Sequence, residues 1–309
     1  MLRIGPGGSS CSLPGATRAI SLVSIGANHQ RQGNIVREQQ PAQPLPEGIA
    51  AVHGTGFPVV LVHGNGVDHR ILFALDEQLE TAGTLQRIYI DLPGFGGTPA
   101  LAGRAGLPEF AAWLQKLLQN HLGARPFALI GNSLGGLLAQ EMADRFESQV
   151  RGMVLLAPVT RPAAEERTVP ARSVLHEDEL LLEELGPVNA GHYAQMSVIQ
   201  TRANWEQFER HVLPGVLAAD LRAMAHLSTR YFLETLPVDR ERISQIPVLI
   251  ACGRQDHIVG FEDAKALLVR YPNASFLELD RAGHNAHIDQ PEIFAQALAR
   301  WTATLTTSG

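Results

Sequence analysis

A serine between glycines is the feature of this sequence that most directly suggests chemistry. Ser133 lies in the segment Gly131–Gly136, which reads GNSLGG and contains the pattern G-x-S-x-G. A serine hydroxyl is a weak nucleophile at neutral pH and needs a neighbouring base to activate it. A histidine that takes the proton, and a carboxylate that orients the histidine, would complete a nucleophilic site. The sequence offers candidates for both partners.

The place of this pattern between a strand and a helix gives it weight. The apolar run Phe127–Ile130 predicts a buried strand, and Leu134–Phe146 predicts a helix. A nucleophile must stand on a sharp turn between the two, and glycines at positions 131 and 135 remove side chains that would clash there. The turn also sets Ser133 at a helix N-terminus, which favours negative charge. The alternative is a glycine-rich loop whose serine only caps the helix.

His284 is the predicted general base among the 12 histidines of the chain. It follows a strand predicted over Ala274–Leu279 and precedes a helix predicted from Pro291. This order brings it to the same edge of the sheet as Ser133, where ligands bind in such folds. His287 is the nearest rival. We expect it to be a supporting or capping residue, because it lies closer to the helix.

Asp256 is the predicted carboxylate that orients His284. It follows the apolar strand predicted over Pro247–Ala251 and therefore reaches the same edge of the sheet. A serine, an acid and a histidine in this chain order are typical of a nucleophile on a strand-to-helix turn. The rival carboxylates Asp280 and Asp289 are expected to be surface or capping residues. Glu165 and Glu166 are further rivals that lie rather far along the loop after Pro158.

Acyl transfer also needs hydrogen-bond donors for the negatively charged oxygen that develops on the substrate. We expect the backbone N–H of Leu134, directly after the serine, to be one donor. The second is the N–H of Asn65, within the HGNG segment His63–Gly66, where glycines let the backbone approach closely. His63 itself ends a buried strand, which favours a scaffold role.

The elements around these residues alternate between apolar strands and amphipathic helices. Strands are predicted over 58–62, 87–90, 127–130, 152–156, 247–251 and 274–279. Near-continuous apolar strands separated by helices indicate an α/β fold with a mostly parallel sheet covered on both faces. Within 161–245 no strand-like run occurs, and helical spacing recurs over Glu177–Leu185 and Val216–Tyr231. Because it is too long for a plain connection, this stretch predicts a helical insertion.

The chain therefore divides into a predicted core, a helical cap and an N-terminal extension. We expect residues 48–160 and 246–309 to form the core and residues 161–245 the cap. Residues 1–47 are predicted to be a disordered extension that ends in the linker-like run Gln39–Pro46. No acidic residue precedes Glu38, so a transit peptide is the alternative for this segment.

Composition argues against several classes of partner. With 25 Lys and Arg against 31 Asp and Glu, the net charge of −6 leaves no basic surplus for nucleic acid. No uncharged apolar run reaches the roughly 18–20 residues that span a bilayer. Cys11 and Cys252 form neither a disulfide framework nor a metal spacing, and Cys252 is expected in the core. We expect no metal, no cofactor, no membrane partner and a cytoplasmic location.

Several ordered motifs together resemble the α/β-hydrolase superfamily over about Phe57–Thr302. They are HGNG (63–66), DLPGFG (91–96), GNSLGG (131–136), GRQD (253–256) and GH (283–284). The resemblance implies a mostly parallel eight-stranded sheet with a helical cap inserted after strand 6. It also implies that the turn beginning at Asp91 is structural.

Serine rather than aspartate at position 133 differs from the haloalkane dehalogenase and epoxide hydrolase branches of that superfamily. The leading prediction is a carboxylesterase-like serine hydrolase that cleaves a small ester, thioester or lactone through an acyl-enzyme. A carbon–carbon hydrolase of ring-cleavage products has a similar elbow, although the loop after Gly64 lacks the longer form found there. A small-molecule binding protein without catalysis, and a cofactor-independent lyase or oxygenase on the same scaffold, are further alternatives. The substrate and the oligomeric state stay open at this point.

Overall fold

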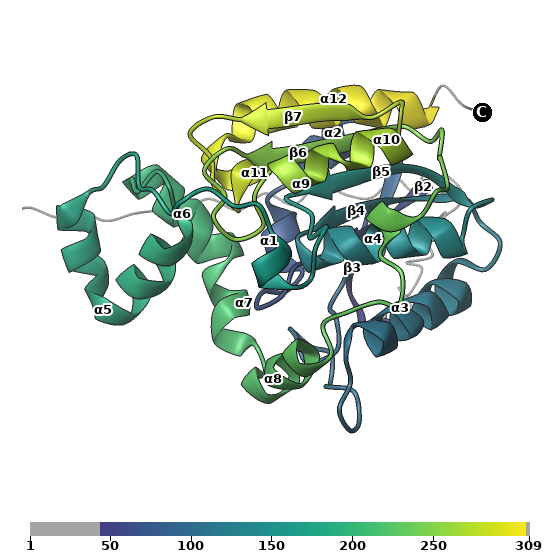
Figure 1. Ribbon diagram of the computed structural model, residues 1–309, viewed down its shortest axis with the longest axis horizontal. Helices are drawn as coiled ribbons and strands as arrows, with labels where there is room; N and C mark the ends of the chain where they lie inside the picture. The colour runs from purple at the N-terminus through teal and green to yellow at the C-terminus, as the bar shows by residue number, and fades with distance from the viewer. Residues whose placement is uncertain (1–43, 307–309) are drawn as a thin grey trace, which may run out of the picture. The chain divides into compact units, whose positions relative to one another are not determined.

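A single seven-stranded sheet organises residues 44–306, which are the residues described by a computed structural model of the chain (Figure 1). The strand order is β1-β3-β2-β4-β5-β6-β7. The prediction for 1–47 falls mainly outside the described residues. The strands are β1 (Ile49–His53), β2 (Phe57–Val62), β3 (Leu85–Ile90), β4 (Phe127–Asn132), β5 (Val150–Leu156), β6 (Val248–Gly253) and β7 (Ser275–Leu279).

The sheet confirms the predicted α/β class and differs from the predicted strand count. Every neighbouring pair is parallel except β1 and β3. The described residues form seven strands rather than eight, and the helical insertion expected after strand 6 follows the fifth of them, β5. Strand β1 was not predicted. It is an antiparallel edge strand with only Ile49 fully buried, so it carries no continuous apolar run.

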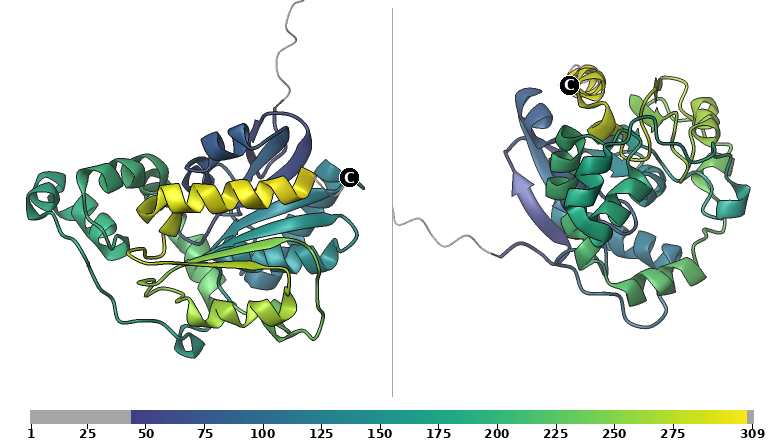
Figure 2. Two further views of the ribbon diagram at one scale, coloured as in Figure 1. Left: turned by 90° about the horizontal axis from the view of Figure 1, so that it is seen from above. Right: turned by 90° about the vertical axis from the view of Figure 1, so that its left-hand side faces the viewer.

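Helices cover both faces of the sheet. The helices outside the insertion are α1 (Arg70–Phe73), α2 (Asp76–Thr81), α3 (Leu107–Leu122), α4 (Leu134–Arg145), α9 (Glu262–Lys265), α10 (Leu267–Arg270), α11 (Ala286–Asp289) and α12 (Pro291–Thr306). Apolar residues of α3, α4 and α10 pack in one buried cluster, and those of α1, α2 and α12 pack in the other. Figure 2 shows α12 and α10 on opposite sides of the sheet.

Four helices occupy the stretch between β5 and β6. They are α5 (Glu179–Met196), α6 (Arg202–His211), α7 (Leu213–Ala218) and α8 (Leu221–Thr229), with short 3₁₀ turns at Ala164–Glu166 and Pro237–Asp239. Helices α5 and α6 lie at the left of Figure 1, beyond the arrowheads of β6 and β7. Within α5 the helix is broken at Gly186, with φ of 71°, and Pro187 follows.

Two predicted helices are divided in the structure. The helix predicted over 216–231 becomes α7 and α8, because the Asp220 side chain accepts hydrogen bonds from the N–H groups of Arg222 and Ala223 and starts a new helix. The helix predicted over 261–270 is split at Ala266 into α9 and α10. Residues 44–306 contain no helix whose length and apolar character would suffice to cross a lipid bilayer.

Candidate active site

Ser133 occupies a strained turn between β4 and α4. Its backbone has φ of 53° and ψ of −114°, a region that non-glycine residues seldom adopt. Backbone hydrogen bonds hold it there: its N–H donates to Leu156 at 2.9 Å, and its carbonyl accepts from Gly136 at 2.9 Å and from Val159 at 3.0 Å. The surrounding backbone thus fixes the turn on three sides.

The flanking glycines are required by close backbone contacts. A Cβ atom at Gly131 would lie 2.3 Å from the carbonyl oxygen of Gly135. A Cβ atom at Gly135 would lie 2.0 Å from the carbonyl oxygen of Val62. Both distances are far below van der Waals contact, so only glycine fits. This is the crowding that the sequence pattern predicts.

The Ser133 hydroxyl does not cap α4. Ser133 is the N-cap residue by position, yet its side chain makes no capping hydrogen bond. By contrast, the Thr201 side chain accepts from the N–H of Asn204 at the start of α6. The Ser133 hydroxyl therefore takes no part in starting α4, and the residue is 7% exposed. The capping alternative for this serine therefore loses its support.

Asp256 and His284 form a buried hydrogen-bonded pair. Nδ1 of His284 lies 2.8 Å from Oδ2 of Asp256, which is completely buried. The other oxygen, Oδ1, accepts from the N–H groups of Ile258 at 2.8 Å and Val259 at 3.1 Å. Because an ionised carboxylate only accepts, Nδ1 carries the proton and Nε2 is left as the basic nitrogen.

The three predicted residues reach one edge of the sheet. Ser133 follows β4, Asp256 follows β6 and His284 follows β7, and these strands belong to the parallel part of the sheet. Across residues 44–306, no hydrogen bond joins the Ser133 hydroxyl to His284. Such contacts are often long without substrate and tighten when it binds.

The predicted oxyanion donors belong to two separate segments near Ser133. Leu134 is the first residue of α4, and Asn65 is an exposed residue of the loop after β2. That loop passes close to the serine, because a Cβ atom at Gly64 would lie 3.0 Å from Cβ of Ser133. The structure thus sets the loop after β2 and the first turn of α4 beside Ser133.

His63 connects this loop to the segment after β3 by hydrogen bonds. Its Nδ1 lies 2.7 Å from the carbonyl oxygen of Gly64, and its Nε2 accepts from the N–H of Leu92 at 2.9 Å. Burial lowers the pKa of His63, so the ring is neutral and donates from Nδ1. The geometry agrees with the scaffold role expected for this histidine.

None of the rival residues within 44–306 is hydrogen-bonded to His284. His287 is buried, with Nε2 3.2 Å from the carbonyl oxygen of Ile71. Asp280 is exposed and pairs with Arg254, and Asp289 accepts from the N–H of Gly283 at 2.8 Å. The remaining rivals, Glu165 and Glu166, are exposed in a 3₁₀ turn.

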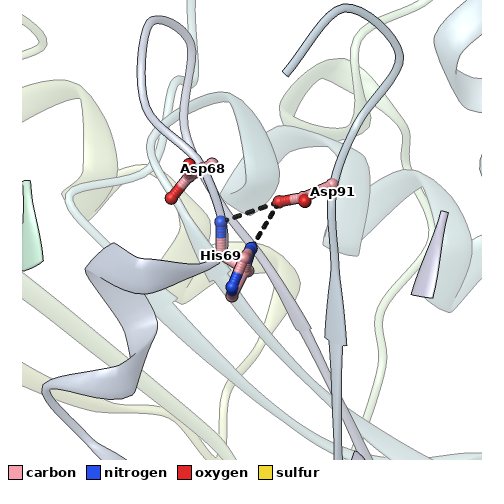
Figure 3. A group of neighbouring side chains, drawn as sticks. All are labelled: Asp68, His69 and Asp91. Atoms are coloured by element: carbon pink, nitrogen blue, oxygen red, sulfur yellow. Dashed lines mark hydrogen bonds and ion pairs between the residues drawn. The ribbon is translucent and has the colours of Figure 1, made fainter. Parts of the chain in front are cut away.

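A cluster of Asp68, His69 and Asp91 lies beside the same loop and was not predicted (Figure 3). One ligand atom from each lies within 4.8 Å of the others, a set that suits a divalent cation. Both oxygens of Asp91 already accept hydrogen bonds, from His69 N–H at 3.0 Å, His69 Nδ1 at 2.8 Å and Gly97 N–H at 2.9 Å. Asp68 pairs with the guanidinium of Arg70. The cluster therefore acts as a hydrogen-bonded brace between the 63–70 loop and the Asp91 turn.

The sequence signal for this brace was the pair of adjacent polar residues, Asp68 and His69, shortly after the HGNG segment. Nothing in their spacing linked them to Asp91, because that contact depends on the parallel register of β2 with β3. The pairing of Val62 with Ile90 sets the two following loops side by side.

Comparisons with known proteins agree with this geometry. A pimeloyl-[acyl-carrier protein] methyl ester esterase of Chromobacterium violaceum is 28% identical over 256 residues, covering 81% of this chain and 96% of that protein. The crystal structure of an alpha/beta superfamily hydrolase from Oenococcus oeni superimposes with a TM-score of 0.76 at 27% identity, covering 83% of this chain and 95% of that one. An esterase from Thermogutta terrifontis gives a TM-score of 0.57 at 26% identity, with 82% and 92% covered.

A family model described as the alpha/beta hydrolase fold matches residues 58–291. The match spans the glycine-flanked serine, the buried Asp256–His284 pair and the helices between β5 and β6. The chain therefore belongs to the α/β-hydrolase fold family.

Proposed function

We propose that this hydrolase cleaves an ester, thioester or lactone through an acyl-enzyme on Ser133. The observation that carries the proposal is the Ser133 hydroxyl, which does not cap α4 and lies on a strained turn. The same edge of the sheet bears the Asp256–His284 pair. Relatives of this chain are named as esterases, which supports ester hydrolysis as the reaction class.

The proposed reaction begins at the serine. Nε2 of His284 takes the hydroxyl proton while Oγ of Ser133 attacks the substrate carbonyl carbon, and Asp256 stabilises the imidazolium that forms. The backbone N–H groups of Leu134 and Asn65 donate to the oxyanion. His284 then returns the proton to the departing alcohol or thiol, which leaves the acyl group on Ser133.

Water completes the cycle. His284 removes a proton from a water molecule, whose oxygen attacks the acyl carbon, and the second tetrahedral intermediate collapses. The acid is released, and the proton on His284 passes back to Oγ of Ser133. Because Nε2 of His284 acts in both acylation and deacylation, the rates of both steps depend on the position of the imidazole ring.

We infer that residues 161–245 act as a cap over this site and that residues 48–160 and 246–309 are the core. Cap residues contact the loops on both sides of the serine. The methyl carbon of Met224 lies 3.4 Å from where a Cβ of Gly66 would be, and a methyl of Val198 lies 2.7 Å from the corresponding point at Gly283. The acyl group of the substrate would lie between cap and core.

Labelling with a fluorophosphonate probe tests the proposal. Wild-type protein should form a covalent adduct and hydrolyse aryl esters, and Ser133→Ala should do neither, with turnover lower by about a thousandfold or more. Ser228→Ala is the matched control, because that hydroxyl donates to a carbonyl on the exposed side of α8. Unchanged turnover in Ser133→Ala would refute the assignment, and an unlabelled wild type would favour a binding protein.

A further inference from the structure

Asp289 links the segment before His284 to the cap. Its Oδ2 accepts from the backbone N–H of Gly283 at 2.8 Å, and its Oδ1 accepts from Nδ2 of Asn204 at 2.9 Å. Gly283 directly precedes His284, and Asn204 belongs to cap helix α6. One carboxylate therefore holds a peptide of the histidine loop and a side chain of the cap at the same time.

The chain of hydrogen bonds continues into the cap. Oδ1 of Asn204 accepts from the hydroxyl of Tyr193 on α5 at 3.0 Å. Tyr193 is completely buried, with its ring packed edge-on against Trp205 and Phe208. The Tyr193 hydroxyl also lies within hydrogen-bonding distance of the carbonyl oxygens of Ile199 and Thr201. The orientation of the Asn204 amide follows from Asp289, because an ionised carboxylate only accepts and therefore faces the NH₂ group of Asn204.

Direct packing joins the same segments. A Cβ atom at Gly283 would lie 2.7 Å from a methyl of Val198 and 3.4 Å from the carbonyl oxygen of Met196, both in the segment that ends α5. The backbone of Gly283 therefore contacts the cap and leaves no room for a side chain. The Asp289 carboxylate belongs to the same contact, because its Oδ2 lies 3.7 Å from that Cβ position.

Burial disfavours the ionised form of Asp289. Burial raises the pKa of this carboxyl to about 6, although the hydrogen bonds from Gly283 and Asn204 lower it and the charge of Asp256 raises it further. A neutral side chain of the same shape would avoid this cost. Asparagine could accept from Gly283 but would present its own NH₂ group to Asn204, so the carboxylate is what lets both bonds form.

We propose that Asp289 is a positioning residue that fixes the His284 imidazole relative to the cap through the Gly283 N–H and the Asn204 amide. This inference rests on the proposed function, in which His284 is the base. Loss of either bond lets the histidine loop shift, and a displacement of about 1 Å at a reacting group can cost about a hundredfold in rate. Because the groups proposed to bind the substrate carbonyl, the N–H groups of Leu134 and Asn65, are unchanged, the loss should fall on kcat and not on KM.

The test is a swap of the two polar partners. Asp289→Asn alone should slow fluorophosphonate labelling and kcat by about ten- to a hundredfold with little change in KM. The double variant Asn204→Asp with Asp289→Asn restores a donor facing an acceptor: the new amide donates to the new carboxylate, which still accepts from Tyr193. It should recover most of the lost rate. Asn273→Asp, at an exposed amide that contacts Gln245, is the control for adding a carboxylate.

Each outcome decides the inference separately from the proposed function. If wild type is labelled, the positioning role is refuted when Asp289→Asn keeps the wild-type labelling rate and kcat, or when the double variant does not recover the lost rate. The serine mechanism stands in both cases. If wild type is not labelled at all, the proposed function itself fails. Should Asp289→Asn not fold, Tyr193→Phe removes the outermost hydrogen bond, and an unaltered labelling rate there would count against the coupling.

Discussion

At the scale of single residues, the site depends on groups that the surrounding backbone forces into unfavourable states. Ser133 has a positive φ, and Asp256 is an acceptor in the interior with both oxygens occupied. Such strain persists only where neighbouring contacts over-determine it. Here the contacts are main-chain hydrogen bonds, which survive most side-chain substitutions. The geometry at the nucleophile is thus a property of the fold more than of its immediate side chains.

His287 is expected to make stability depend on pH. Burial lowers its pKa from 6.5 to about 4, so the unfolded chain takes up a proton below pH 6.5 that the folded chain refuses until about pH 4. The stability present above pH 6.5 is therefore lost as the pH falls toward 4, by about 3 kcal/mol from this group. His287→Gln, whose amide can still donate to Ile71, should flatten this slope in urea melts between pH 4 and 7. An identical slope in both proteins would contradict this.

The residues of the site could be predicted from sequence because their signals are local. A glycine two positions before and after Ser133, and a short polar loop after each apolar strand, locate Ser133, Asp256 and His284 without knowledge of distant contacts. The link from Asp289 to the cap could not be predicted, because it depends on where α6 lies against the histidine loop. From the sequence, Asp289 was only a rival to Asp256 as the partner of His284 and was expected to be a surface or capping carboxylate.

At the scale of elements, the nucleophile turn leaves no room for a side chain next to it. Gly135→Ala should destabilise the protein by about 3 kcal/mol or more and reduce labelling, because the added Cβ would lie 2.0 Å from the carbonyl of Val62 on β2. Gly191→Ala in α5 is the matched control. It has nothing within 4 Å and should stabilise by up to about 1 kcal/mol. Thermal melts of the two variants with shifts of the same sign would be inconsistent with this.

Elements were predictable where their apolar pattern was strong. The six predicted strands all occur, and five of them are largely buried, whereas the edge strand β7 is only partly buried. The edge strand β1 was missed because half-burial leaves no run to detect. The helices over 216–231 and 261–270 were predicted as continuous, since helical spacing survives a break of one or two residues. The Asp220 cap makes the first break, and the second, at Ala266, has no side-chain cap.

At the scale of the molecule, an ion-pair cluster joins the end of the insertion to the core. Asp144 on α4 pairs with Arg270 on α10 and with Arg240, which follows the 3₁₀ turn Pro237–Asp239 near the end of the cap. Arg240 also pairs with Glu141. Three segments that are distant in sequence thus share one carboxylate, and Arg270 is almost completely buried.

Removing that carboxylate should destabilise the whole protein. Asp144→Asn leaves the guanidinium groups of Arg240, Arg242 and Arg270 without their shared partner, and Arg270 is buried. It should lower the free energy of unfolding by about 3–5 kcal/mol. Glu147→Gln is the control, because its pair with Arg242 is exposed and should be worth at most about 1 kcal/mol. Chemical denaturation measures both. Equal losses in the two variants would show that burial does not decide the contribution here.

The interruption of α5 at Gly186 and Pro187 bears on how this part of the chain stays folded. The halves are rods of roughly two and three turns. Both are below the roughly 12–15 residues at which a lone helix becomes even marginally stable in water. Tyr193 anchors one half in the interior and Leu181 anchors the other, while Leu180 and Val188 are largely exposed. The joint between the two rods, rather than either rod, is consequently where a protease would be expected to make its first cut.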